Sequence, residues 1–182
     1  MNTLLSGKKL TGDILSDRLL INAFFENRIK GKINLLTAGT GVGKTHNTMK
    51  KLIPRLIEEG TTKFLVTTPL KDSAISSKIV FKNMRKDIEK YLDKKLNSDI
   101  VIEFAENIDE FINSFKDENK IMILVANTDS ILNSPTKKKS NRELIVEFSA
   151  KHLSLNKLAV IADVTLPPTF KLPVAFIFPL NV

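Results

Sequence analysis

The chain has 182 residues, enough for one domain with a sizeable core but too few for two full α/β domains. It contains no cysteine and only two histidines, His46 and His152, so disulfides, thiolate metal sites and a histidine metal cluster are excluded. Hydrophobic residues make up 42% and charged residues 26%, as in a soluble globular protein, which argues against extended disorder.

The chain is basic, with 28 Lys and Arg against 20 Asp and Glu and a net charge of +8. This charge would attract a polyanion such as nucleic acid, and solubility is an equally good explanation for it. The N-terminus lacks the apolar run of a signal peptide, and Leu172–Val182 is too short and too rich in proline to span a bilayer. We therefore expect a cytoplasmic protein with no membrane partner.

The first predicted elements surround a group of glycines. Apolar positions at helical spacing predict a helix over Asp13–Phe25, within an N-terminal segment 1–30. The apolar run Ile33–Thr37 predicts a buried strand that leads directly into the glycines. A helix is predicted from Gly43 to about Glu59, kinked or shortened by Pro54 and ended by Gly60.

Downstream, apolar runs that predict strands alternate with segments of helical pattern. The expected strands are Lys63–Pro69, Ile100–Ala105, Ile121–Thr128 and Leu158–Thr165, and the expected helices are Lys71 to about Leu96, Asn107–Phe115 and a helix from the capping box Ser140–Glu143 to about Leu155. This alternation predicts an α/β fold with a mainly parallel sheet and helices on both faces. We expect one domain over 1–182, in which the proline-rich tail 166–182 has no clear pattern.

The eight residues AGTGVGKT lie between the first predicted strand and its helix. In that context backbone N–H groups point at phosphate oxygens, the lysine reaches the β and γ phosphates, and the threonine hydroxyl holds Mg²⁺. Alanine stands where the strict pattern has its first glycine, and the other glycines are kept. The pattern predicts a P-loop whose nucleotide-binding residues are Ala38, Gly39, Thr40, Gly41, Val42, Gly43, Lys44 and Thr45.

A P-loop also needs an Asp at the end of a neighbouring apolar strand, where it orients Mg²⁺. Asp163 follows the apolar run Leu158–Ala162 and is the best candidate, although an Asp that only caps the next turn would look the same. Asp129 is the weaker candidate because three residues separate it from its apolar run. We expect Lys44, Thr45 and Asp163 to be the catalytic residues, with Thr45 and Asp163 as the metal ligands.

Four segments resemble, in order, the first, Ia, Ib and Walker B motifs of the N-terminal RecA-like lobe of superfamily 2 helicases, such as the DEAD/DEAH-type enzymes and the motor subunits of type I and type III restriction enzymes. They are LLTAGTGVGKTHNTMKKLI, KFLVTTPLKDSA, IMILVANTDSIL and LAVIAD. The resemblance implies a P-loop NTPase that binds ATP and Mg²⁺ and acts on nucleic acid, with DNA as the expected form. It further implies that Pro69, Lys71 and Thr128 lie along the nucleic-acid backbone, and a solvated surface charge is the alternative for Lys71.

Three departures from the family pattern bear on activity. Val164 follows Asp163 where the family has a Glu that acts as general base, and valine cannot accept a proton. Translocation needs a second RecA-like lobe, so the chain is either a truncated or degenerate lobe or is completed by a partner chain. No Gln before the glycines is suited to read adenine. We therefore expect weak or no hydrolysis by the chain alone. One alternative is a non-catalytic nucleotide-dependent regulator. The other is a small P-loop kinase, and the scarcity of arginine in the chain argues against the kinase.

Overall fold

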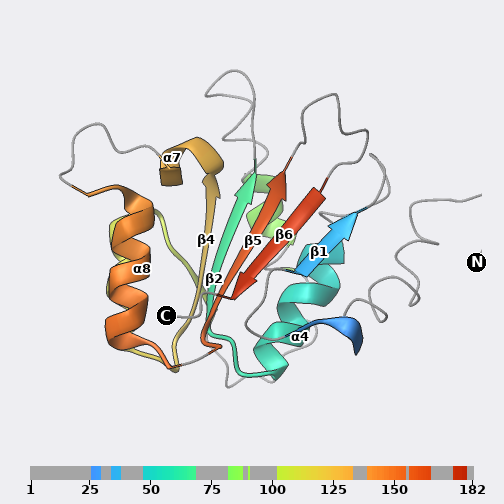
Figure 1. Ribbon diagram of the computed structural model, residues 1–182, viewed down its shortest axis with the longest axis horizontal. Coiled ribbons are helices and arrows are strands. Elements are labelled where there is room, and N and C mark those ends of the chain that lie inside the picture. Colours follow the sequence, from blue (N-terminus) through green and yellow to red (C-terminus); the bar gives the residue numbers. More distant parts are fainter. Residues whose placement is uncertain are drawn as a thin grey trace, which may run out of the picture.

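The computed structural model describes residues 26–29, 34–37, 47–68, 82–87, 90, 102–132, 139–154, 156–164 and 174–179. Six strands form one sheet in the order β1-β6-β5-β2-β4-β3 (Figure 1). They are β1 Asn34–Thr37, β2 Lys63–Thr68, β3 Ile102–Phe104, β4 Ile121–Asn127, β5 Leu158–Val164 and β6 Val174–Pro179. The neighbours β5, β2, β4 and β3 are parallel, and β6 is antiparallel to both β5 and β1. The expected α/β class with a mainly parallel sheet is confirmed.

Helical segments connect the strands. They are the π-helix η1 Thr48–Leu52, α4 Ile53–Glu58, α6 Ile108–Asn113, the 3₁₀-helix η2 Ser114–Lys116, α7 Thr128–Leu132 and α8 Asn141–His152. Residues 82–87 and 90 are helical as well, as expected for the segment after β2. The helix predicted over Asp13–Phe25 and most of the one over Lys71–Leu96 lie outside the described residues. Within the described residues, no helix has the length and apolar character to cross a bilayer.

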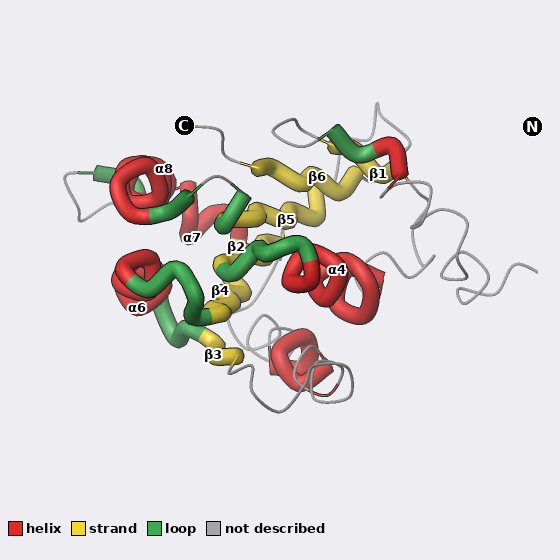
Figure 2. Tube along the Cα trace, turned by 90° about the horizontal axis from the view of Figure 1, so that it is seen from below, coloured by secondary structure: helices red, strands yellow, loops and turns green. Residues whose placement is uncertain are grey.

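The sheet carries a core on each face because successive side chains of a strand point to opposite sides. Phe64 and Val66 of β2 belong to one cluster, with buried residues of η1 and α4 and with Met84. Leu65 belongs to the other cluster, with residues of α6, η2 and α8. Figure 2 shows the strands between these two groups of helices. The predicted cover of helices on both faces is confirmed.

Pro54 lies where the helix after the glycine-rich segment changes its pitch. The Ile53 N–H donates to the Thr48 carbonyl, five residues back, and the α-helix α4 begins at Ile53. Proline has no N–H and its ring crowds the carbonyl four residues back, so a wider turn in front of it relieves the clash. After α4, Gly60 has φ of 93°, a left-handed conformation that suits glycine at a helix end. The predicted effects of Pro54 and Gly60 are confirmed.

The helix α8 begins with the predicted capping box. Ser140 Oγ accepts a hydrogen bond from the Glu143 N–H at 3.2 Å, and Glu143 Oε2 accepts one from the Ser140 N–H at 2.7 Å. Two amide groups at the helix start are thereby satisfied without water.

The tail 166–182, in which we expected no pattern, contains the strand β6. This strand lies between β1 and β5 and pairs with both. Its sequence, VAFIFP, is a continuous apolar run with no polar residue to alternate with. The prediction was wrong because prolines are typical of loops. Here Pro173 precedes the strand and Pro179 is its last residue, a position where a missing N–H interrupts little of the hydrogen-bond ladder.

Candidate functional site

The site residues predicted from the sequence lie at or after the carboxyl ends of four strands. These four strands, β1, β2, β4 and β5, end at the same edge of the sheet, as their arrowheads show in Figure 1. The glycine-rich segment follows β1, Pro69 and Lys71 follow β2, Thr128 follows β4, and Asp163 is next to last in β5. In open α/β sheets, ligands bind beyond the carboxyl ends of the strands. Residues 38–46, Pro69 and Lys71 lie outside the described residues, whereas Thr128 and the backbone of Asp163 are described.

The pairing across β6 relates Asp163 to the strand before the glycines. Ala175 of β6 pairs with Leu36 of β1 on one side and with Asp163 of β5 on the other. Leu36 and Asp163 therefore lie level in the sheet, two strand spacings or about 10 Å apart. The glycine-rich segment begins at Ala38, two residues beyond Leu36. The candidate cradle and the candidate metal ligand thus start two strand positions apart on one edge of the sheet.

The helical run after the glycines is anchored on the sheet. It continues through η1 and α4, and it packs on the sheet through Met49, Leu52, Ile53 and Leu56, all of which are buried. Because β1 and β2 run in the same direction, the chain has to cross from the carboxyl end of β1 to the amino end of β2, and this run forms part of that crossing. Segment 38–46 is therefore preceded by a paired strand and followed by a packed helix.

Sheet order separates the two candidate carboxylates. The strand before Asp129, β4, is four positions from β1, or roughly 19 Å, whereas β5 is two positions away. Asp129 is exposed in the first turn of α7, where its N–H donates to Asn127 Oδ1 at 2.8 Å. Of the two, Asp163 starts closer to the segment after β1.

Thr128 begins α7 at the end of β4. The turn is tied down by Ser130, whose hydroxyl donates to the Asn127 carbonyl at 2.7 Å, and by Asn141 of α8, whose Nδ2 donates to the Ser130 carbonyl at 2.7 Å. Thr128 Oγ1 is closed off from solvent and makes no hydrogen bond in the described part of the chain. In this conformation a phosphate would meet the backbone of α7 rather than the Thr128 hydroxyl.

Two acidic pairs elsewhere in the chain could in principle replace the missing Glu. The first of them, Asp109–Glu110, lies in the first turn of α6. The Glu110 carboxylate accepts the Glu106 N–H at 2.7 Å, and its own N–H donates to Asn107 Oδ1 at 2.9 Å. The pair thus belongs to the cap of a helix that follows β3, three positions from β5 in the sheet. It is not a neighbour of Asp163.

The second acidic pair, Asp117–Glu118, lies in the turn before β4, at the opposite edge of the sheet. Glu118 Oε1 accepts hydrogen bonds from the Ser154 N–H at 2.6 Å and from its hydroxyl at 2.8 Å. These bonds favour the ionised form and lower the pKa of the Glu118 carboxyl. Neither pair therefore supplies a base beside Val164.

Lys63, the first residue of β2, is a buried charge that the sequence analysis did not single out. Its Nζ donates to the Asp117 carbonyl at 2.7 Å and to the Lys120 carbonyl. Burial lowers its pKa to about 8, against the opposing effect of the nearby Asp117 charge. The side chain ties β2 to the turn before β4, far from the carboxyl edge, so we assign it a structural role. A lone lysine at the start of an apolar run gives no signal of this in the sequence.

The residues expected to hold Mg²⁺ are Thr45, outside the described residues, and Asp163, of which the backbone is described. Within the described ranges, no three His, Asp or Glu side chains group in a way that could hold a metal ion.

Comparisons with protein-family models, with curated proteins and with solved structures found no match for this chain.

Proposed function

We propose that this chain binds ATP and Mg²⁺ in the glycine-rich segment after β1 and works with nucleic acid, as a domain resembling the first lobe of superfamily 2 helicases. The strand order carries the proposal. β1 and β5 have one strand, β6, between them and end at the same edge, so the glycines and Asp163 follow strand ends two positions apart. A phosphate cradle and its metal ligand both need to lie at the carboxyl edge of the sheet, as these two do.

In this proposal, the backbone N–H groups of Gly39 to Thr45 and the Lys44 ammonium group hold the β and γ phosphates. Thr45 and Asp163 hold Mg²⁺, which neutralises charge on the phosphates. Because Ala175 of β6 lies between Leu36 and Asp163 and pairs with both, the phosphates and the ion would lie beyond the ends of these strands, at the carboxyl edge.

The nucleic-acid part of the proposal rests on charge and on the resemblance. With a net charge of +8, the chain would gain affinity for a polyanion by neutralising its phosphates. Pro69, Lys71 and the backbone at Thr128 follow β2 and β4, which are neighbours in the sheet. DNA that crosses these strand ends would run beside the bound nucleotide, and a second lobe from a partner chain would complete a motor.

A non-catalytic regulator is the second candidate, and the end of β5 favours it. Val164 is the last residue of that strand, and the acidic pairs Asp109–Glu110 and Asp117–Glu118 lie elsewhere in the fold. Without a carboxylate to orient water, bound ATP would fix a conformation instead of being consumed.

The test is the titration of the purified chain with a fluorescent ATP analogue in the presence of Mg²⁺. We expect Lys44→Ala to weaken binding at least tenfold and Asp163→Asn to reduce the dependence on Mg²⁺, with Asp129→Asn as the matched control that changes neither. Unchanged affinity in Lys44→Ala would refute the nucleotide site. Phosphate release that DNA stimulates would favour the enzyme, and binding without turnover would favour the regulator.

A further inference from the structure

Three exposed lysines recur every four residues in the helical segment after β2. Lys82, Lys86 and Lys90 are all exposed, and residues 82–87 and 90 are helical. Residues four apart lie on one face of an α-helix, about 6 Å apart along its axis. Together with Lys51 of η1, these lysines form what we call the basic ridge.

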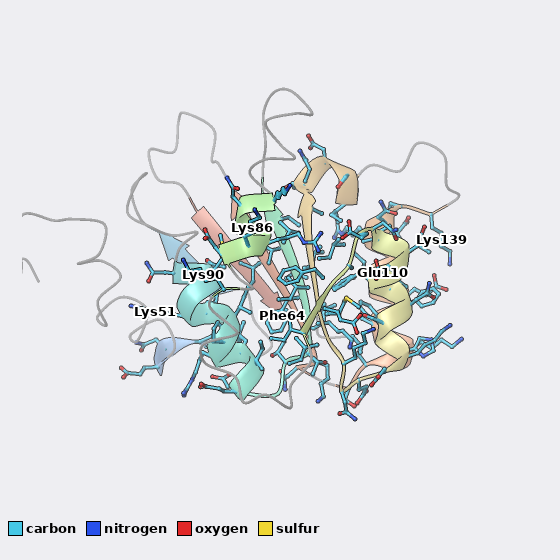
Figure 3. The ribbon with its side chains drawn as sticks, turned by 180° about the vertical axis from the view of Figure 1, so that it is seen from behind. Lys51, Phe64, Lys86, Lys90, Glu110 and Lys139 are labelled. Carbon is cyan, nitrogen blue, oxygen red and sulfur yellow. The ribbon has the colours of Figure 1, made fainter. Side chains whose placement is uncertain are left out.

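The two helical segments of the ridge are neighbours on one face of the sheet. Met84 packs in the same core cluster as Met49 and Leu52 of η1. Figure 2 places this helical segment next to α4 on the same side of the sheet, and Figure 3 shows Lys86, Lys90 and Lys51 along that side. In Figure 3 the three follow one another away from the edge where β2 and β4 end, with Lys86 nearest to it. The ridge therefore begins close to the carboxyl edge.

The ridge lysines differ from the arginines beside them. Arg85 pairs with Glu106 at 2.7 Å and lies over the Phe104 ring at 5.0 Å, and Arg55 pairs with Glu59 at 3.3 Å. None of the four ridge lysines forms an ion pair with any residue of the described ranges. Like charges four residues apart destabilise a helix, so a bound anion would relieve a repulsion that the isolated fold carries.

We propose that the basic ridge binds the phosphate backbone of nucleic acid. The inference rests on the nucleic-acid part of the proposed function and adds to it a contact surface outside the strand ends. A row of lysine point charges suits a row of backbone phosphates, which require charge but no base-specific geometry. Nucleic acid that crosses the ends of β2 and β4 could continue along the ridge without a sharp turn.

An anionic membrane is the other large polyanion, and the packing of the helix argues against it. A helix that binds lipid inserts an apolar face into the bilayer. Here Met84, the apolar residue of segment 82–87, is only 8% exposed because it packs in the core of the domain. Among the described residues of this segment, the exposed side chains are all polar or charged, which suits nucleic acid better than a bilayer.

The experiment measures binding of the full chain to a fluorescent DNA duplex by anisotropy, without nucleotide, across a series of salt concentrations. Lys86→Gln/Lys90→Gln is compared with Lys116→Gln/Lys151→Gln, which removes the same charge from exposed lysines of η2 and α8 on the other face. The logarithm of the binding constant falls with the logarithm of the salt concentration, and each phosphate contact contributes about 0.9 to the steepness of that fall. The double ridge variant Lys86→Gln/Lys90→Gln, called the ridge pair, should therefore make the fall less steep by about 1.8. The control pair should leave it unchanged. Changing all four ridge lysines to Gln should lower the slope by about 3.6.

Thermal unfolding of every variant is recorded alongside, so that loss of binding with a retained melting transition is attributed to the ridge.

Equal losses in the ridge pair and the control pair would overturn the inference, because net charge would then explain the binding. DNA binding that survives all four substitutions would overturn the ridge and leave the proposed function standing. A wild-type chain that binds no DNA would overturn the ridge and the nucleic-acid part together, while ATP binding is tested separately. Ridge-dependent binding to phosphatidylserine vesicles that is tighter than binding to DNA would assign the ridge to membranes instead.

Discussion

At the end of β5, Asp163 is followed by Val164, whose side chain has no group that can take a proton from water. If the missing carboxylate limits hydrolysis, Val164→Glu should raise the rate of phosphate release at saturating ATP by about 10²-fold or more, the usual contribution of a general base. Val164→Gln is the matched control because it has the same size and polarity without the basic carboxylate. Equal rates for the two variants would mean that another group, in this chain or a partner, governs turnover.

Lys63 makes a prediction about stability and pH. Its pKa is about 8 in the folded chain and 10.5 when exposed, so below about pH 8 it is charged in both the folded and unfolded states. As pH rises from 8 toward 10.5, the folded chain has released a proton that the unfolded chain still holds, and the free energy of unfolding increases. We therefore expect the stability of the wild type relative to Lys63→Met to grow across this window.

Urea unfolding at several pH values checks this expectation. Lys116→Met serves as the control, because Lys116 is exposed and lies in η2, close to the turn that Lys63 holds. A difference between wild type and Lys63→Met that stays flat or shrinks as pH rises would contradict the assignment of a buried, charged lysine.

Among the elements, β6 determines how the two halves of the candidate site sit relative to each other. β1 contacts the rest of the sheet through β6, and Ile177 pairs with Asn34 on one side and with Ile161 on the other. Proline at this position would remove an N–H and place a ring inside a strand that is paired on both sides. We expect Ile177→Pro to weaken ATP binding at least tenfold, because β1 and its glycines would lose their position relative to Asp163.

Two further measurements distinguish a local effect of β6 on ATP binding from unfolding of the whole domain. The four parallel strands β5, β2, β4 and β3 pair without β6, so far-UV circular dichroism should retain most of its helical signal in Ile177→Pro. Ile177→Val, which keeps the N–H and the β propensity, should bind ATP like the wild type. Normal ATP affinity in the proline variant would show that the site does not depend on β6.

The elements themselves were largely predictable from local sequence. The five predicted strands all coincide with β1 to β5, because each is an apolar run of suitable length between turn residues. Ser140 and Glu143 identified the start of α8, since the capping box is a local hydrogen-bonding pattern. β6 was missed because the prolines at its two ends are typical of a loop. This run is a strand because it pairs with β5, about ten residues earlier in the chain, and with β1, more than 130 residues earlier.

At the scale of the whole molecule, charge and topology give different kinds of information. The net charge of +8 is a property of composition and allowed both a polyanion partner and mere solubility. The fold adds that Lys86, Lys90 and Lys51 lie on one side of the sheet, with Lys82 four residues before Lys86 in the same helical segment. Arg85 and Arg55 are instead paired with acids. The spacing of four residues between Lys82, Lys86 and Lys90 is visible in the sequence. That these lysines lie on the same side of the sheet as Lys51 depends on how the two helical segments pack.

The sequence by itself determined the α/β class, the strands up to β5, the capping box and the glycine-rich pattern on which the proposed function rests. These features follow from local rules: periodicity, turn residues and side-chain hydrogen bonds within a few residues. Only the tertiary structure decided that β6 lies between β1 and β5, that Asp163 starts closer to the glycines than Asp129, and that Lys63 is buried. Those outcomes depend on strand order and packing, which bring together residues far apart in the chain and leave little trace in any one stretch of it.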